Sequence, residues 1–194
     1  MQKTTILLTI LGFLSSTLYS QREEPTTLSD NPRSEKQFAI SLDMGAKSMA
    51  GTGIAFTYYQ STNIALDAGV GIGIQGFKGG IRARYLLLQK NFTPYVGLGV
   101  YAHPTQVVDL EFISLELLDP PYFVTINRTV FGQLLVGFEY IAERGFLIGL
   151  NLGYSVNFNS EPWISDVATE IDINFLNLLY GSGISAGFTI GYAF

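Results

Sequence analysis

The sequence predicts an all-β fold, an eight-stranded antiparallel up-and-down transmembrane β-barrel. Three observations support this prediction: apolar side chains recur at every second position in eight segments, only 14% of the 194 residues are charged, and both long connections fall on the same side. A typical soluble domain carries about 25% charged residues. Strands that lie within a bilayer satisfy their backbone hydrogen bonds only when they close into a barrel.

The N-terminal residues have the pattern of a secretory signal peptide. Lys3 precedes an apolar run over residues 6–14, and small polar residues follow it. The run is shorter than the roughly 20 residues that a membrane-spanning helix needs. We expect residues 1–20 to be a signal peptide, with a retained anchoring helix as the alternative. The polar, proline-containing residues 21–36 are expected to form a disordered periplasmic lead-in, and residues 37–194 the barrel.

Eight segments alternate between apolar residues and residues that are small, polar or charged. Most are long enough to cross a bilayer as tilted strands, which takes about 9–11 residues. Residues 173–194 hold no charged side chain and have the length of a membrane helix, but their glycines and their period of two indicate a strand. The predicted strands are residues 37–46, 53–60, 64–75, 77–88, 94–103, 130–141, 146–157 and 184–194.

The connections between these strands predict how the barrel is oriented. Two long connections, residues 104–129 and 158–181, lie at one end, and short polar links lie at the other. Transmembrane barrels have short periplasmic turns and longer extracellular loops. Aromatic residues near the strand ends are expected to form a girdle at each membrane interface. The periplasmic girdle comprises Phe38, Tyr58, Tyr95, Tyr140, Phe146, Tyr192 and Phe194, and the other comprises Phe77, Tyr154 and Phe158.

The inward face of the predicted barrel is balanced in charge. It carries Asp43, Asp67 and Glu139 against Lys78, Arg82 and Arg84. A buried charge is costly unless it is paired, and eight strands leave an interior just wide enough for side chains. We therefore expect a buried salt-bridge network that plugs the lumen, with an ion path or a gate as the alternative. Four leucines fall in phase with this polar face without fitting it: Leu86, Leu88, Leu135 and Leu147.

Composition argues against several kinds of site and partner. With no cysteine and one histidine, the chain can form neither a thiolate metal site nor a histidine cluster. The net charge of −5 argues against a nucleic-acid partner. His103 would need a nucleophile and an orienting acid to act as a catalytic base; Thr105 and Asp109 are near, but the order "HPT" lacks a His-x-Ser pattern. We expect no catalytic residue, no metal and no cofactor.

The two long connections mix acidic with apolar residues. We expect their apolar side chains to pack together, either in a sheet that extends above the membrane or in an amphipathic helix over the barrel. An exposed apolar patch for a surface partner or for lipid is the alternative. The acids could also share divalent cations with lipopolysaccharide, because hard cations favour carboxylate oxygens, although no stretch has the spacing of an EF-hand loop.

The alternation over residues 37–194, together with Tyr192 and Phe194, resembles the small eight-stranded outer-membrane barrels of the OmpA/OmpX type, in the outer membrane protein β-barrel domain group. In that group, a terminal phenylalanine with an aromatic residue two positions earlier resembles the signal that the barrel-assembly machinery reads. The resemblance therefore implies that Tyr192 and Phe194 form an assembly signal. It also implies a place in the cell outer membrane, beside its lipid and lipopolysaccharide.

The function that this resemblance implies is non-enzymatic. The barrel would support the integrity of the cell envelope, or present its two long loops for surface interactions. A lipid-modifying outer-membrane enzyme and a narrow channel are the alternatives. A soluble lipocalin-like binding protein is disfavoured, because its apolar face would line the cavity instead of the outside.

Overall fold

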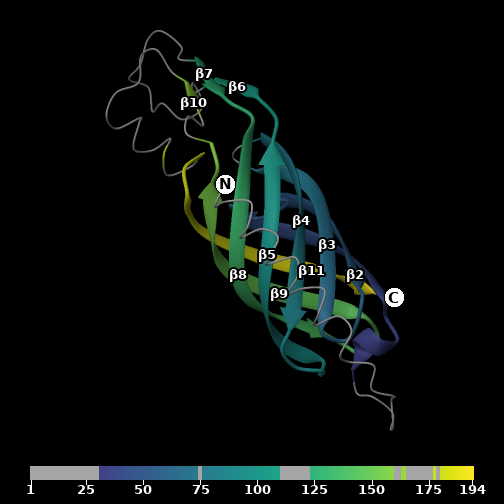
Figure 1. The fold of residues 1–194 in the computed structure, drawn as a ribbon. Helices are drawn as coiled ribbons and strands as arrows, with labels where there is room; N and C mark the ends of the chain where they lie inside the picture. Colours follow the sequence, from purple (N-terminus) through teal and green to yellow (C-terminus); the bar gives the residue numbers. More distant parts are fainter. Residues whose placement is uncertain (1–30, 74–75, 110–122, 160–162, 165–176, 178–179) are drawn as a thin grey trace.

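Eight antiparallel strands close into a barrel in the computed structural model, which describes residues 31–73, 76–109, 123–159, 163–164, 177 and 180–194 (Figure 1). Around the barrel the strands follow the order β1, β11, β9, β8, β5, β4, β3, β2. Their bounds are β1 (Phe38–Ala46), β2 (Thr52–Tyr59), β3 (Ile64–Gly73), β4 (Gly76–Leu86), β5 (Phe92–His103), β8 (Thr129–Ile141), β9 (Phe146–Asn157) and β11 (Gly183–Ala193). The predicted fold class is confirmed, and every predicted strand matches an observed one to within two residues at each end.

The two ends of the barrel differ in their connections. One end carries the turns at residues 60–63, 87–91 and 142–145, and is called the short-turn end below. The opposite end carries the loop at residues 47–51 and both long connections, and is called the long-connection end.

Three short strands form a separate sheet at the long-connection end, at the top of Figure 1. They are β6 (Gln106–Asp109), β7 (Phe123–Ile126) and β10 (Trp163–Ile164), with β7 between the other two. Strands from both long connections therefore form a sheet, one of the two predicted alternatives, while Asn177 and Tyr180 of the second connection are helical. Residues 110–122, 160–162, 165–176 and 178–179 lie outside the described ones. No helix in the described part of the chain is long and apolar enough to cross a membrane.

The first and the last strand close the cylinder. β1 and β11 are antiparallel, and their ladder begins with Ala39 opposite Ala193. Beyond it, Phe38 and Phe194 exchange backbone hydrogen bonds, with N···O distances of 3.2 and 2.8 Å. The ladders of the eight barrel strands therefore form a complete circle, so the strands have no open edge whose N–H and C=O groups would stay unpaired.

The outward face of the barrel is apolar. Exposed side chains on it include Ile54, Leu134 and Ile184, which are 57%, 61% and 75% exposed. The outward positions of the eight described strands hold no charged residue. All six charged residues of these strands are buried in the interior; they are Asp43, Asp67, Lys78, Arg82, Arg84 and Glu139. This distribution is the reverse of that in a water-soluble protein, in which charged residues are almost never fully buried unless paired.

Aromatic rings gather at the short-turn end of the outward face. Phe38 stacks on Phe56 and on Tyr58, with centroids 5.7 and 5.3 Å apart. The sequence placed Tyr95 in this girdle, and that prediction is wrong. Tyr95 is 3% exposed, and the Arg84 guanidinium lies 5.0 Å from its ring centroid. Strand phase decides its position, because alternate residues of β5 point inward even near a strand end.

Apolar side chains fill the lumen at the short-turn end. Three of the leucines that did not fit the polar face belong here, since Leu86, Leu135 and Leu147 are at most 2% exposed. Leu88 lies beyond the end of β4 and is exposed. This apolar layer comprises Ala39, Tyr59, Ala65, Leu86, Tyr95, Leu135, Ile141, Leu147 and Ala193.

The loop at residues 47–51 folds into the lumen at the long-connection end. Met49 is 1% exposed, and the Lys47 carbonyl accepts a hydrogen bond from Gln133 Nε2 (3.3 Å) on the opposite wall. The inward face makes room for the loop where it lacks side chains. A Cβ on Gly69 would lie 2.7 Å from the Met49 Cε, closer than packed carbon atoms approach. The glycines of the inward face therefore accommodate a loop as well as neighbouring strands.

Candidate functional site in the barrel lumen

Asp67 is the centre of an ion-pair network in the lumen. Its Oδ2 lies 2.6 Å from Arg82 Nε and 2.8 Å from Arg84 Nε. Its Oδ1 accepts hydrogen bonds from Arg84 Nη2 and from Thr57 Oγ1, both at 2.8 Å. Strand register explains the geometry, because Asp67 on β3 stands opposite Arg82 on β4 and Arg84 is diagonal to it.

Glu139 on β8 extends the network toward the short-turn end. Its Oε2 accepts a hydrogen bond from Arg84 Nη1 at 2.6 Å. Its Oε1 accepts from Tyr59 OH at 3.0 Å and from Arg33 Nη2 and Nε at 2.9 and 3.1 Å. Arg84 therefore bridges Asp67 and Glu139, and neither carboxylate depends on one partner alone.

Asp43 on β1 completes the network on the side of the β1–β11 seam. Thr189 Oγ1 donates a hydrogen bond to its Oδ1 at 2.8 Å, and Arg82 Nη2 lies 3.9 Å from its Oδ2. The ion-pair network thus contains three acids and three arginines, all at most 6% exposed: Asp43, Asp67, Glu139, Arg33, Arg82 and Arg84. Its charges balance, as burial requires.

Arg33 comes from the lead-in that the sequence suggested is disordered. That expectation is corrected for its last part, because Pro32–Ser34 form a short 3₁₀ helix (η1) capped by the Asn31 side chain, and Arg33 is 2% exposed. Its Nη1 donates to the Lys90 carbonyl at 2.7 Å in a turn of the short-turn end. The order Asn-Pro is a helix-start signal, but a lone arginine has no periodicity that would place it in the lumen. Residues 21–30 lie outside the described part.

Replacing Arg33 with methionine should destabilise the folded barrel by about 1–3 kcal/mol, the usual cost of leaving a buried acceptor without one partner. Glu139 would keep Arg84 and Tyr59, which limits the loss. Guanidinium unfolding in detergent measures the free energy, and limited proteolysis should show faster cleavage at residues 31–36. The matched control is Arg144→Met, an exposed arginine at the same end; an equal effect of both changes would contradict the role of Arg33 in the lumen.

The structure also corrects the prediction for Lys78, which the sequence placed in the salt-bridge network. Among the described residues it makes neither an ion pair nor a hydrogen bond. It lies toward the long-connection end, with its Nζ 5.1 Å from the Tyr101 ring centroid. Arg33 takes its expected place as the third base. Sequence alternation gave the inward direction of Lys78 but not its height in the barrel relative to the acids.

His103, at the end of β5, is buried without the partners of a catalytic base. Its ring lies 5.9 Å from that of Phe131 and 6.5 Å from that of Tyr180. Its Nδ1 lies 3.3 Å from the Pro104 carbonyl. The Thr105 hydroxyl accepts a hydrogen bond from the Arg128 backbone N–H at 3.0 Å. In the described part of the chain, therefore, no nucleophile, histidine and acid stand in line.

Two side chains at the long-connection end, those of Lys47 and Tyr180, have shifted pKa values. Burial lowers the pKa of Lys47, whose Nζ donates a hydrogen bond to the Gly181 carbonyl at 2.6 Å. Burial raises the pKa of Tyr180 to about 12, so its hydroxyl stays protonated at neutral pH. Over the described residues, no group of three or more histidine, aspartate and glutamate side chains is arranged to hold a metal ion.

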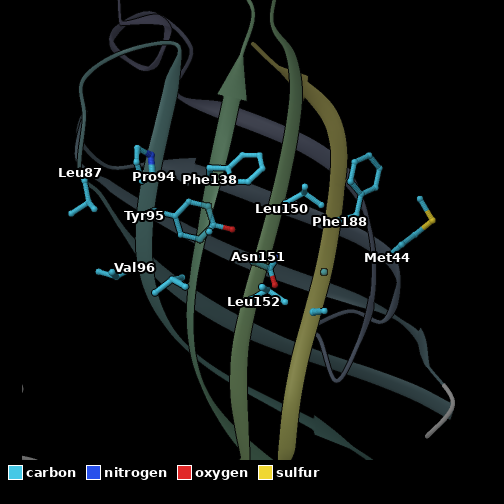
Figure 2. A pocket seen from close by; sticks show the side chains of 14 residues that line it. Met44, Leu87, Pro94, Tyr95, Val96, Phe138, Leu150, Asn151, Leu152 and Phe188 are labelled. Carbon is cyan, nitrogen blue, oxygen red and sulfur yellow. The ribbon is translucent and has the colours of Figure 1, made fainter.

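The outward wall has a mostly apolar depression of about 800 Å³ across β1, β5, β8, β9 and β11. Figure 2 shows Met44 and Phe188 on one side of it, Leu87 and Val96 on the other, and Phe138 and Leu150 between them. Its lining is apolar apart from Tyr95 and Asn151, which are 3% and 6% exposed, so its chemistry suits acyl chains.

Tyr192 and Phe194 lie at the short-turn end, where the sequence predicted a girdle. Tyr192 is 54% exposed and Phe194 55%, and the Phe194 ring centroid lies 6.4 Å from that of Phe38. Their role as an assembly signal remains a prediction.

Comparisons with known proteins give likenesses of fold. No family model and no curated protein matches the chain. The chain is similar to the crystal structure of the N-terminal β-barrel domain of Pseudomonas aeruginosa OprF, with 14% identity, a TM-score of 0.48, and coverage of 82% of this chain and 98% of that one. It is also similar to the crystal structure of Acinetobacter baumannii CarO, with 10% identity, a TM-score of 0.42, and coverage of 82% and 98%.

Proposed function

We propose that this protein is a non-enzymatic barrel of the cell outer membrane with a closed lumen. The observation that carries the proposal is the outward face, on which none of the eight described strands places a charged residue. Transmembrane barrels carry such an apolar band flanked by aromatic girdles. Short turns are periplasmic in barrels of this kind, so the long-connection end would face the cell exterior.

The filled lumen supports a structural role over a channel. The apolar layer and the Arg33–Glu139 part of the ion-pair network occupy the short-turn end, Asp43, Asp67 and Arg82 lie farther from that end, and the loop at residues 47–51 lies in the long-connection end. An eight-stranded barrel has an interior just wide enough for side chains to fill. The barrel is thus a rigid support, and rigid supports present functional loops. Envelope integrity, or interaction through residues 104–129 and 158–181, is the role that follows.

The proposal is tested with the full chain in its native envelope and in planar bilayers. We expect the protein in the outer-membrane fraction, extracted only by detergent, with gel mobility that changes on heating. Purified protein should give no sustained conductance in a planar bilayer. Recovery in a soluble fraction would end the membrane assignment, and large sustained currents would establish the channel alternative.

A further inference from the structure

Lys78 is a cation in the lumen for which the described residues supply no anion. Its side chain is at most 2% exposed, and no described residue forms an ion pair or a hydrogen bond with it. The three acids of the lumen are already engaged by the three arginines of the ion-pair network. The charge of this ammonium is therefore not balanced by a described acid, and an anion beside it would stabilise it.

Aromatic rings and glycines fix the position of Lys78. Its Nζ lies 5.1 Å from the centroid of the Tyr101 ring, a favourable cation–π distance. Its Cε is 2.7 Å from where a Cβ on Gly51 would lie and 3.1 Å from where one on Gly73 would lie. The stem is therefore held between two chain segments.

His103 supplies a second unsatisfied group beside this ammonium. The Tyr101 ring stacks on Phe131 with 4.9 Å between centroids, and the His103 ring lies 5.9 Å from that of Phe131. On β4 and β5, Gly79 stands opposite Ala102, so one residue farther along the same register Lys78 and His103 lie on facing positions of adjacent strands. The His103 side chain is 1% exposed, and its Nε2 is buried without a hydrogen-bond partner among the described residues.

The tautomer of His103 defines what Nε2 requires. The Pro104 carbonyl can only accept, so the contact at 3.3 Å assigns the proton to Nδ1. In the neutral imidazole, Nε2 is then an acceptor. A ligand that satisfies both groups must offer oxygens to the ammonium and a hydroxyl to the imidazole. Hydrogen phosphate carries both at neutral pH, whereas sulfate, ionised carboxylates and doubly ionised phosphate monoesters carry only the oxygens.

We infer that Lys78 and His103 form a binding site for a small, hydroxyl-bearing oxyanion of the hydrogen-phosphate class, inside the long-connection end of the lumen. Lys78 neutralises the anion and donates to its oxygens, and His103 Nε2 accepts from its hydroxyl. Both residues point to the interior of the barrel, so the ligand is a soluble anion and not the headgroup of a lipid outside the wall.

Inorganic phosphate is the probe, used with the full-length protein folded in detergent. We expect a saturable rise in unfolding temperature of roughly 2–4 °C when phosphate reaches a few times its dissociation constant, measured at constant ionic strength against chloride. Sulfate should give a smaller rise. The rise should disappear in Lys78→Met and persist in Lys90→Met, which removes an exposed lysine at the opposite end.

The unliganded variant gives an independent readout. Methionine keeps the volume of the lysine stem and removes the unpaired charge, so Lys78→Met should unfold at a higher temperature than the natural protein in chloride. A lower unfolding temperature would show that the chain itself satisfies Lys78, and would overturn the inference. A phosphate effect that survives in Lys78→Met, or that is absent in the natural protein, would overturn it too. Equal effects of phosphate and sulfate would overturn the assignment of a hydroxyl-bearing ligand.

Discussion

Asp67→Asn should destabilise the folded barrel by about 3–5 kcal/mol, the cost of removing one partner from a buried ion pair. The amide keeps the shape of the carboxylate but not its charge. Arg82 would be left with Asp43 at 3.9 Å, and Arg84 with Glu139 alone. The free energy of unfolding in guanidinium, measured in lipid vesicles, gives the effect.

The matched control for this change is Glu143→Gln, which removes one negative charge from an exposed turn position. Surface substitutions of this kind usually change stability by no more than about 0.5 kcal/mol. A loss below about 1 kcal/mol for Asp67→Asn would mean that water reaches the arginines and that the lumen is not sealed. Because Arg84 bridges both acids, the effects of Asp67→Asn and Glu139→Gln should not add.

Leu134→Arg should cost about 2–4 kcal/mol, the penalty for arginine on the lipid face near the bilayer midplane. Leu134 lies in the middle of β8, points outward and is 61% exposed, so in water the same change would be nearly neutral. The measurement is again unfolding in lipid vesicles. This variant therefore distinguishes a lipid-facing wall from a water-facing wall.

Leu88→Arg provides the control, because Leu88 is also exposed but lies in a turn beyond β4. It should change the free energy of unfolding by a few tenths of a kcal/mol. Equal small effects at both positions would contradict the membrane assignment, whatever the fold.

Strand positions were predictable because alternation is a local property. In β9, residues 148–157 alternate without a break, so both the strand and the direction of each of these side chains follow from the sequence alone. Asp67 and Arg84 were predictable neighbours for the same reason, since one short hairpin sets their register. The predicted arrangement of acids and arginines on adjacent strands was therefore close to the observed one.

Contacts across the barrel were not predictable from local pattern. The inward fold of residues 47–51 depends on space left by Gly69 and on a hydrogen bond from Gln133, far along the chain. Arg33 reaches Glu139 on a strand that is distant in sequence. Alternation shows which face a residue occupies, but height in the lumen and partners on the opposite wall depend on the closed circle of strands.

The Arg33–Glu139 contact joins residues 106 positions apart, and the β1–β11 seam joins the two ends of the barrel sequence. Contacts this distant close long loops, and the entropy lost in closing them slows folding. Until the circle is complete, the lumen arginines and acids lack part of their counter-charge, so half-assembled sheets are poor long-lived states in lipid. The ion-pair network thus affects the kinetics of assembly. It favours a cooperative closure of the barrel, because the final strand pairing supplies the missing partners of the buried charges.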